Sequence, residues 1–403
     1  MTLIPNFDAA TFVPGTQINN PYFPLEPGTI YVYEGESADE ETGEESEELI
    51  RFAVTFQTEE IAGVTATVVQ ETAWVDGFLE EHTHDWFAQD TDGNVWYLGE
   101  FTTAYEYDDD GNFIGTNNDG AWEAGVNGAL PGYIMPANPQ VGDNYYQEFA
   151  PEDEALDQAE VISNDQTLST EIGTFSNVLQ TLEFSELAPG VFDFKYYAPG
   201  IGLVLVEELD ENLEPEFIVE LESITSVSEE AFTSGYGTKG NDVLDGDNGV
   251  NILKGFKGDD LLQGFGGEDW LVGQKGNDFL VGGNGLDLLE GGKGEDILIG
   301  GQGIDILEGG KDRDQFVFRT LGDKGDLIQD FNHEDVIILV EIFNSGNYDS
   351  SNPIDDYLQI QQLGSLTVIS IDSDGDAGSN PFEVLAILQH TNASSLSDAN
   401  FVV

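Results

Sequence analysis

Residues 282–310 read GGNGLDLLEGGKGEDILIGGQGIDILEGG, and this pattern repeats every nine residues. Nine such units run from Gly237 to Val317, all beginning with glycine, and eight of them have glycine at position four. Position six is aspartate in every unit except the second, which has Asn251, and position eight is leucine in every unit except the last. A period this regular predicts a solenoid in which each unit stacks on its neighbours.

The composition of each unit predicts how the chain turns. Glycine at positions one and four suits a bend whose backbone visits positive φ and whose carbonyl groups crowd toward one point. The apolar residues around position eight form a short strand, with the leucine directed inward. Lysine recurs at position three every 18 residues, from Lys239 to Lys311, and position five alternates with the same period. Two units per coil explain both patterns, so the sequence predicts an 18-residue parallel β-roll with two chemically different edges.

The position-six side chains form one ladder along each edge of this roll. Layers of a sheet lie about 4.8 Å apart, so unpaired carboxylates would repel one another. Carboxylates and inward-facing carbonyl groups are hard oxygen ligands, which favour Ca²⁺ over transition metals and over Mg²⁺. The candidate metal ligands are Asp242, Asp260, Asp278, Asp296 and Asp314 on one edge, Asn251, Asp269, Asp287 and Asp305 on the other, and the bend glycines Gly240, Gly258, Gly276, Gly285, Gly294 and Gly303. An ion between each unit and the unit two later gives at most about four gaps on one edge and about three on the other, hence about seven Ca²⁺. Asn251 lacks a charge, so we expect weaker binding beside it.

Residues 237–318 closely resemble the repeats of the RTX (repeats-in-toxin) proteins. The resemblance implies a secreted protein that a type I secretion machinery exports by an uncleaved C-terminal signal, and that folds when it meets external calcium. The start, MTLIPNFDAATFVPG, has no basic n-region and no apolar h-region, so we expect no cleavable signal peptide, which fits that route. The alternative, a flexible Gly/Asp-rich linker, explains neither the leucine column nor the lysine period.

The residues after the repeats predict a β-rich cap and a secretion signal over 319–403. The D-x-FVF…GD-x-I-x-DF…D-x-I-x-L pattern from Asp314 to Leu339 resembles the cap that follows the repeats of secreted RTX proteins, and a solenoid needs its last coil covered. Asp330 is one more candidate calcium ligand, with a solvated turn acid as the alternative. The stretch Asp372–Glu383 has EF-hand-like spacing, but Ala377 stands where that loop needs glycine, which favours a hairpin turn. The final SLSDANFVV resembles type I secretion signals.

Residues 1–228 contain no repeat. Segments such as TIYVYE, RFAVTFQ and VTATVVQETAWV alternate with period two, and Asp-Gly and Gly-Asn turns separate some of them. The expected fold class is therefore all-β, with an N-terminal antiparallel β-domain over 1–228, a barrel or half-barrel, followed by the parallel β-roll over 229–318 and the cap. The N-terminal part loosely resembles bacterial secreted β-domains, which share no common activity.

Motifs for catalysis are absent from the N-terminal part: there is neither HExxH nor GxSxG. Glu80, His82 and His84 share one face of an expected strand and are a candidate metal site, with polar surface residues as the preferred interpretation. The tryptophans and tyrosines of this part are candidates for a ligand groove, but we expect them to fill the core, among them Trp86, Trp96, Trp122, Tyr97, Tyr105 and Tyr107.

Charge limits the range of partners. The chain has 79 acidic and 11 basic residues, a net charge of −68. Nucleic acid is therefore not expected as a partner, because it requires a basic surface, and no apolar run is long enough for a transmembrane segment. The preferred hypothesis is an exported calcium-binding protein whose N-terminal domain binds an unknown ligand. The alternatives are a secreted hydrolase with an unrecognised site and a surface-layer or adhesin component.

Overall fold

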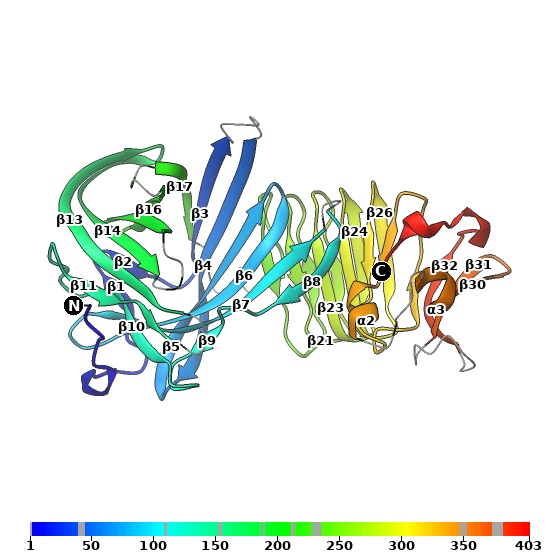
Figure 1. Cartoon of the computed structure of the whole chain (residues 1–403), viewed down its shortest axis with the longest axis horizontal. Helices are drawn as coiled ribbons and strands as arrows, with labels where there is room; N and C mark the ends of the chain where they lie inside the picture. The colour runs from blue at the N-terminus through cyan, green and yellow to red at the C-terminus, as the bar shows by residue number, and fades with distance from the viewer. Residues whose placement is uncertain are drawn as a thin grey trace. The chain divides into compact units, whose positions relative to one another are not determined.

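The computed structural model describes residues 2–38, 45–108, 111–151, 155–185, 187, 190–210, 213, 215–226, 228, 235–345, 348, 353–372 and 382–403 (Figure 1). The chain forms two compact units: Met1–Ala104 with Asn117–Phe232, and Tyr105–Thr116 with Thr233–Val403. Strands make up most of both units, which confirms the expected all-β class. None of the helices in the described ranges has the length and apolar character required to cross a membrane.

The first unit is an antiparallel sheet. A short 3-10 helix, η1 (Phe7–Ala9), precedes the strands. They are β1 (Ile18–Asn20), β2 (Phe23–Leu25), β3 (Thr29–Ala38), β4 (Glu45–Ile61), β5 (Val64–Val75), β6 (Phe78–Gln89), β7 (Val95–Tyr107), β9 (Trp122–Glu123), β10 (Leu130–Met135), β11 (Asn144–Tyr146), β12 (Glu148–Phe149), β13 (Asp157–Thr170), β14 (Gly173–Ser185), β15 (Phe192–Ala198), β16 (Gly202–Leu209) and β17 (Pro215–Ser226). The strand order is β11-β13-β14-β15-β16-β17-β3-β4-β5-β6-β7-β10-β12, and β1 pairs separately with β2.

Local sequence explains the hairpins of this sheet. Buried and partly buried side chains alternate along much of β5, as its period-two pattern requires. Asp76 and Gly77 connect β5 to β6, with φ of +52° and +81°. Two successive residues with positive φ form the type I′ turn that suits the twist of paired strands. The same geometry at Ala62 and Gly63 joins β4 to β5, so consecutive strands become neighbours in the sheet.

The sheet curves until it is nearly closed, as Figure 1 shows for β13 to β17, and this confirms the expected barrel or half-barrel. Its core contains the aromatic residues singled out in the sequence: Trp96 and Trp122 are fully buried, and the Trp96 ring lies 4.5 Å from that of Tyr133. Trp86, Trp96, Tyr97 and Trp122 therefore fill the core, as expected. Tyr105 and Tyr107 do not, because they belong to the second unit, where their rings contact Phe279 and Phe113. Tyr97 has an additional role, described below.

The second unit contains the roll and the cap. Its strands are β8 (Phe113–Asn117), β18 (Val243–Asp245), β19 (Ile252–Lys254), β20 (Leu261–Gln263), β21 (Gly266–Gly267), β22 (Trp270–Val272), β23 (Phe279–Gly285), β24 (Leu288–Lys293), β25 (Ile297–Gly303), β26 (Ile306–Lys311), β27 (Gln315–Val317), β28 (Asp326–Ile328), β29 (Val336–Ile338), β30 (Leu358–Leu363), β31 (Leu366–Asp372), β32 (Phe382–Gln389) and β33 (Phe401–Val402). The helices are α2 (Val340–Ser345), α3 (Pro353–Tyr357), η2 (Ala393–Ser395) and η3 (Asp398–Asn400).

The roll has the predicted 18-residue coil. Strands pair in parallel with an offset of 18 residues, as Val243 does with Leu261 and Leu261 with Phe279. Alternate nonapeptides enter two different sheets, one through β18-β20-β23-β25-β27 and the other through β19-β22-β24-β26. The position-eight side chains form one buried column between them: Leu244, Leu253, Leu262, Leu271, Leu280, Leu289, Leu298, Leu307 and Phe316. The inward direction predicted for this position is confirmed.

The side chains at position seven face away from this column, and their exposure differs between the two sheets of the roll. Phe279 is buried because the segment Tyr105–Thr116 lies on it, with the Phe113 ring 5.5 Å away. The Phe113 backbone N–H also donates to Gln315 Oε1 at 2.8 Å. On the other sheet, Ile252 and Trp270 remain exposed. The segment Tyr105–Thr116 thus covers position seven on one face of the roll.

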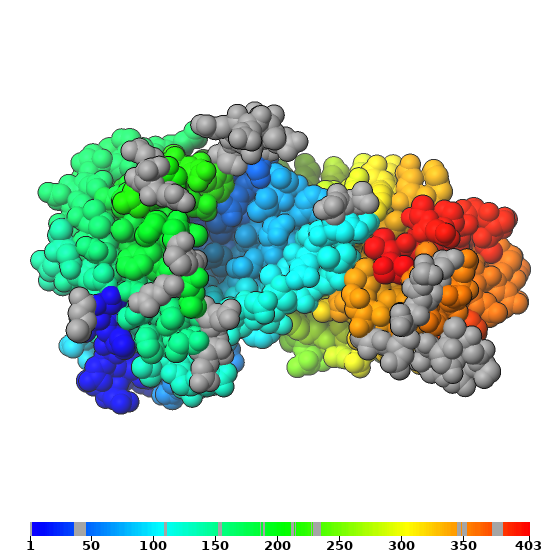
Figure 2. Space-filling model, viewed as in Figure 1, coloured from blue at the N-terminus to red at the C-terminus, as the bar shows by residue number. Residues whose placement is uncertain are grey.

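The cap continues both sheets of the roll. Strand β28 pairs in parallel with β26 and β32, and β29 pairs in parallel with β27 and β33. Strands β30, β31 and β32 form an antiparallel meander, and the cap makes the orange-to-red surface in Figure 2. The last residues are part of this fold, since Phe401 is buried and pairs with Ile337.

Candidate metal centres

The position-six aspartates form two regular ladders. The backbone N–H of Asp260 donates to Oδ1 of Asp278 in the next coil at 3.0 Å. The same contact recurs at 2.8–3.0 Å along one edge, from Asp242 to Asp260, Asp278 to Asp296 and Asp296 to Asp314, and along the other, from Asn251 to Asp269, Asp269 to Asp287 and Asp287 to Asp305. Each ladder carboxylate therefore uses one oxygen to hold the coil before it.

The second oxygen of most of these carboxylates, Oδ2, makes no hydrogen bond. Among the described residues, Oδ2 is buried without a hydrogen-bond partner in seven of them: Asp260, Asp278, Asp296 and Asp314 on one edge, and Asp269, Asp287 and Asp305 on the other. A buried oxygen that carries charge and has no partner costs several kcal/mol unless a cation or a proton compensates it, on the order of the cost of desolvating the charge. Such a row of oxygens is the donor set that Ca²⁺ prefers.

Carbonyl oxygens converge on the same bends. A Cβ placed on Gly282 would lie 2.6 Å from Asp287 Oδ2 and 2.7 Å from the carbonyl oxygen of Gly300, two units later. The same pair of oxygens, one from a carboxylate and one from a backbone carbonyl, lies beside Gly237, Gly264 and Gly291, in a space that only a missing side chain leaves open. The residues present therefore fit a hard divalent cation.

One expectation about the glycines is wrong. From the third nonapeptide to the ninth, positive φ occurs at positions two and four rather than at one and four, and position two has it even where the residue is Phe256 or Gln274, at +76° and +82°. Position one is glycine because the ladder carboxylate and a carbonyl oxygen occupy the space of a side chain, as at Gly282. Position four is glycine for both reasons: Gly276 has φ of +114°, and a Cβ added there would collide with the carbonyl oxygen of Gly258.

Electrostatics in the bends favour any bound positive charge. Burial, together with neighbouring carboxylates such as Asp278, raises the pKa of Asp260 to about 9, and the pKa of Asp296 also to about 9. Burial raises the pKa of Asp314 to about 8. Without metal, Asp260, Asp296 and Asp314 therefore hold protons at neutral pH, and a cation that binds beside them must displace these protons.

The two ends of the ladders differ from the middle. In the first nonapeptide, Thr238 donates to Asp242 Oδ2 through its backbone N–H at 2.5 Å and its hydroxyl at 3.1 Å. Asn251 Oδ1 likewise accepts from the backbone N–H of Asp247 at 3.0 Å. At the far end, the ladders continue into the cap through Asp326 and Asp335.

Asp326 and Asp335 were not among the ligands predicted from the sequence. They accept from the backbone N–H groups of Asp305 and Asp314, at an offset of 21 residues rather than 18. The signal that identifies them is an aspartate directly before a short apolar strand, as in DLI and DVI.

The remaining candidates lie elsewhere. Asp330 stands outside both ladders and accepts from the backbone N–H groups of Gly309 and Gly310, at 3.0 and 2.8 Å, so it holds the last bend. In the EF-hand-like stretch, residues 373–381 lie outside the described residues.

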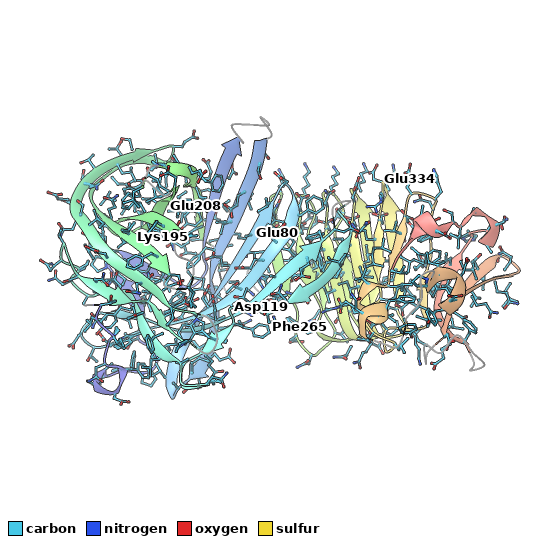
Figure 3. The ribbon with its side chains drawn as sticks, viewed as in Figure 1. Glu80, Asp119, Lys195, Glu208, Phe265 and Glu334 are labelled. Carbon is cyan, nitrogen blue, oxygen red and sulfur yellow. The ribbon has the colours of Figure 1, made fainter. Side chains whose placement is uncertain are left out.

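The histidines of β6 lie together on one face, with rings 4.9 Å apart. His82 Nδ1 lies 2.8 Å from the Thr72 hydroxyl, and His84 Nε2 lies 3.4 Å from Gln70 Nε2. Glu80, labelled in Figure 3, sits where the β5–β6 register shifts. In the described part of the first unit, no three His, Asp or Glu side chains approach closely enough to share an ion.

The first unit contains a cavity of about 330 Å³. Of the aromatics named as candidates for a ligand groove, Tyr97 lines it, but its acidic lining was not predicted. Carboxylates from many strands line it, and they are far apart in the sequence, so no motif connects them. Lys195 on β15 and Glu208 on β16, both labelled in Figure 3, also belong to its lining.

Comparison with known proteins identifies the repeats. The family model of the RTX calcium-binding nonapeptide repeat matches residues 236–264, 263–298 and 290–318. None of the curated proteins compared with this chain matches it.

Solved structures show weak overall similarity. A protein from Bacteroides fragilis, described as exported and with a YmcC-like fold, is 17% identical over 51% of this chain and 99% of its own, with a TM-score of 0.24. A subunit of the mannuronan C5-epimerase of Azotobacter vinelandii is 25% identical over 41% of this chain and 80% of its own, with a TM-score of 0.21. The extracellular lipase of Serratia marcescens is 19% identical over 61% of this chain and 30% of its own, with a TM-score of 0.25. The family model identifies residues 236–318 as RTX calcium-binding nonapeptide repeats.

Proposed function

We propose that this is a secreted calcium-binding protein whose roll folds when its bends fill with Ca²⁺ outside the cell, and whose N-terminal β-unit is a binding module. The single observation that supports the roll's part is the set of seven buried Oδ2 atoms without a partner, such as that of Asp278. They fall four on one edge and three on the other, the numbers expected for one ion in each gap between coils.

The proposed ligands are the ladder carboxylates Asp260, Asp269, Asp278, Asp287, Asp296, Asp305 and Asp314, with carbonyl oxygens of the adjacent bends. Asp242 and Asn251 contribute less, because residues of their own bends already hydrogen-bond to their side chains. When bound, Ca²⁺ supplies the positive charge that lets these buried carboxylates ionise without mutual repulsion.

Coupling to folding follows from the same charges. An unfolded chain keeps its acids apart and solvated, whereas the metal-free roll must bury them side by side, so the cation stabilises only the folded state. Extracellular calcium modules typically bind with dissociation constants of about 10⁻⁴–10⁻³ M, so such sites stay empty in the cytosol and fill outside the cell. Three parts are proposed: the N-terminal domain over 1–228, the roll over 229–318, and the cap with its C-terminal secretion signal over 319–403.

Calcium titration of the full chain tests the proposal. Starting from protein stripped with a chelator, circular dichroism should show a gain of β-structure at calcium concentrations of about 10⁻⁴–10⁻³ M. Magnesium at the same concentrations should give a much smaller change. Unchanged spectra at millimolar calcium, or an equal response to magnesium, would refute calcium-driven folding.

Export has its own test. Co-expression with a type I secretion machinery should place the full chain in the medium, and removal of residues 395–403 should retain it in the cell. Because these residues also form β33, the calcium response of the truncated chain must be measured in parallel. Secretion that persists without them would contradict the proposed signal.

A further inference from the structure

The cavity in the first unit is strongly anionic. Nine carboxylates from eight strands line it: Glu48 on β4, Glu71 on β5, Glu81 and Asp85 on β6, Glu100 on β7, Glu148 on β12, Asp157 on β13, Glu183 on β14 and Glu208 on β16. Among its described lining residues the one base is Lys195, and its Nζ lies 3.0 Å from Glu183 Oε2. That ion pair leaves little positive charge for an anionic ligand, so the lining disfavours anions and attracts cations.

Two of these carboxylates face each other across neighbouring strands. Asp85 and Glu100 are register partners between β6 and β7. The Tyr97 hydroxyl lies 2.6 Å from Asp85 Oδ1 and 2.8 Å from Glu100 Oε2. A hydroxyl has one hydrogen to donate, so the second short contact requires a proton on one of the carboxyls. The cavity without a ligand thus keeps acids neutral that a cation would let ionise.

A buried amide supplies an independent sign of a ligand. Gln147 is 4% exposed, lines the cavity, and has no hydrogen-bond partner at Nε2. Buried polar groups in folded proteins nearly always have a partner, from protein, water or a ligand. Gln147 therefore offers a hydrogen bond to an acceptor atom of whatever occupies the cavity.

The acids do not converge as metal ligands do. Within the described residues of this unit, no three Asp, Glu or His ligand atoms come close enough to hold one ion. Aromatic side chains also form part of the wall, among them Phe52, Phe87, Tyr97 and Tyr197. Rings beside carboxylates suit an organic cation, since the ring faces attract positive charge and cover an apolar body.

We propose that this cavity binds a small organic cation, with an ammonium group among the carboxylates of Asp85, Glu100 and Glu71, an apolar or aromatic body against the rings, and an acceptor atom at Gln147. The inference rests on the proposed role of this unit as a binding module and gives that module a ligand class. The acids ionise as the ammonium group enters, so binding near neutral pH releases protons to the solvent.

A matched pair of compounds tests the charge directly. Tyramine and tyrosol share a phenol and a two-carbon chain and differ only in an ammonium group against a hydroxyl. Isothermal titration of the full, calcium-loaded chain should show tyramine binding at least roughly tenfold more tightly than tyrosol. Repeating the titration at pH 7 in buffers of different ionisation enthalpy should show proton release with tyramine and none with tyrosol.

Variants locate the binding site. Glu100→Gln removes one acid and keeps the shape of the side chain, and should weaken tyramine roughly tenfold. Glu71→Gln on the neighbouring β5 provides a second, independent removal. Glu59→Gln is the matched control, because Glu59 is exposed on β4 and does not line the cavity. Circular dichroism of each variant verifies that it is folded.

Each outcome decides the inference. Absence of tyramine binding, equal affinity for tyrosol, or unchanged affinity in both Glu100→Gln and Glu71→Gln would overturn it. The calcium titration is read separately on the same protein. A roll that folds with calcium beside a cavity that ignores tyramine contradicts only this inference, whereas tyramine binding without a calcium response contradicts only the proposed function of the roll.

Discussion

Asp278 joins two layers of the roll through one of its carboxylate oxygens: Oδ1 accepts a hydrogen bond from the backbone N–H of Asp260, 3.0 Å away and 18 residues earlier. The other oxygen, Oδ2, is buried and has no partner. A single side chain thus sets the spacing of the coils and presents a charge that the protein alone does not neutralise. Structure and metal affinity are therefore coupled at this position.

Replacing this charge should shift the calcium response. Asp278→Asn keeps an oxygen for the Asp260 N–H but removes the negative charge from the bend. We expect the calcium concentration at the midpoint of folding to rise roughly tenfold, equivalent to about 1.4 kcal/mol. The matched control is Glu334→Gln, which removes the same charge from an exposed cap residue labelled in Figure 3. Equal midpoints for the two variants would argue against a ligand role for Asp278.

The second nonapeptide allows the reverse substitution, in which a charge is added to the ladder. Asn251 occupies the ladder position without a charge, and its side chain hydrogen-bonds with Asp247 instead. Asn251→Asp should restore a carboxylate and lower the calcium midpoint of folding, because added ligand charge raises affinity for Ca²⁺. Circular dichroism during calcium titration measures this midpoint. A midpoint that rises instead would show that the bend at Asn251 is not a calcium site.

Two glycines at the same position of the repeat should respond differently to alanine. Gly276 has φ of +114°, and a Cβ there would collide with the carbonyl oxygen of Gly258. Gly240, in the first nonapeptide, has no positive φ, and a Cβ added there would have no other atom within 4 Å. Gly276→Ala should therefore abolish or strongly weaken calcium-induced folding, whereas Gly240→Ala should leave the midpoint nearly unchanged. Equal effects would mean that close approach of the coils is not what selects glycine.

The roll could be predicted from sequence because its interactions are local and periodic. The leucine column, the two edges and the ladder aspartates all follow from a period of 18, and Leu262 and Leu280 lie where that period places them. The ladder residues of the cap could not be predicted from this period, because Asp326 and Asp335 join the ladders at an offset of 21 residues rather than 18. A longer last coil changes the spacing but keeps the hydrogen bond.

The cavity could not be predicted in the same way. Asp85 and Glu183 approach it from β6 and β14, which are far apart both in the chain and in the strand order, and the curvature of the nearly closed sheet lets both line one cavity. Alternation along a strand predicts that one face is inward, but a register shift such as the one at Glu80 changes which residues share that face. Long-range pairing and bulges are therefore why the sequence did not predict this cavity.

The leucine column should dominate the stability of the roll. Leu280 is fully buried between the two sheets, and Leu280→Ala should lower the free energy of unfolding of the calcium-loaded chain by about 2–5 kcal/mol, as cavity formation does in other cores. Ile252 is 46% exposed at position seven, and Ile252→Ala should change it by less than about 0.5 kcal/mol. Urea unfolding in saturating calcium measures both, and a comparable loss at Ile252 would show that the exposed face of the roll is covered in solution.

The acids of the cavity should make the first unit less stable as the pH rises. Burial raises the pKa of Glu71 and of Glu100 to about 7, from an ordinary value of 4.5 in the unfolded chain. The folded state then binds more protons than the unfolded state between these values, so stability is greatest below about pH 4.5 and is lost as the pH rises through about 7. Repulsion from the Glu81 carboxylate raises both pKa values further, whereas Lys195 lowers the pKa of Glu71 and the Tyr97 hydroxyl lowers that of Glu100. Burial also raises the pKa of Asp85 and of Glu148, so these two acids change stability in the same direction.

Tryptophan fluorescence isolates this effect from the roll. Four of the five tryptophans lie in the first unit, so a Trp270→Phe background removes the one in the repeats. In saturating calcium, the melting temperature of this variant should fall by a few degrees between pH 5 and pH 8, at about 2–4 °C for each kcal/mol lost. Adding Glu100→Gln should reduce the fall and raise the melting temperature at pH 8, because an amide does not need the proton that the carboxyl loses. A melting temperature that rises with pH, or a fall that Glu100→Gln leaves intact, would contradict the assignment of the pH dependence to the cavity.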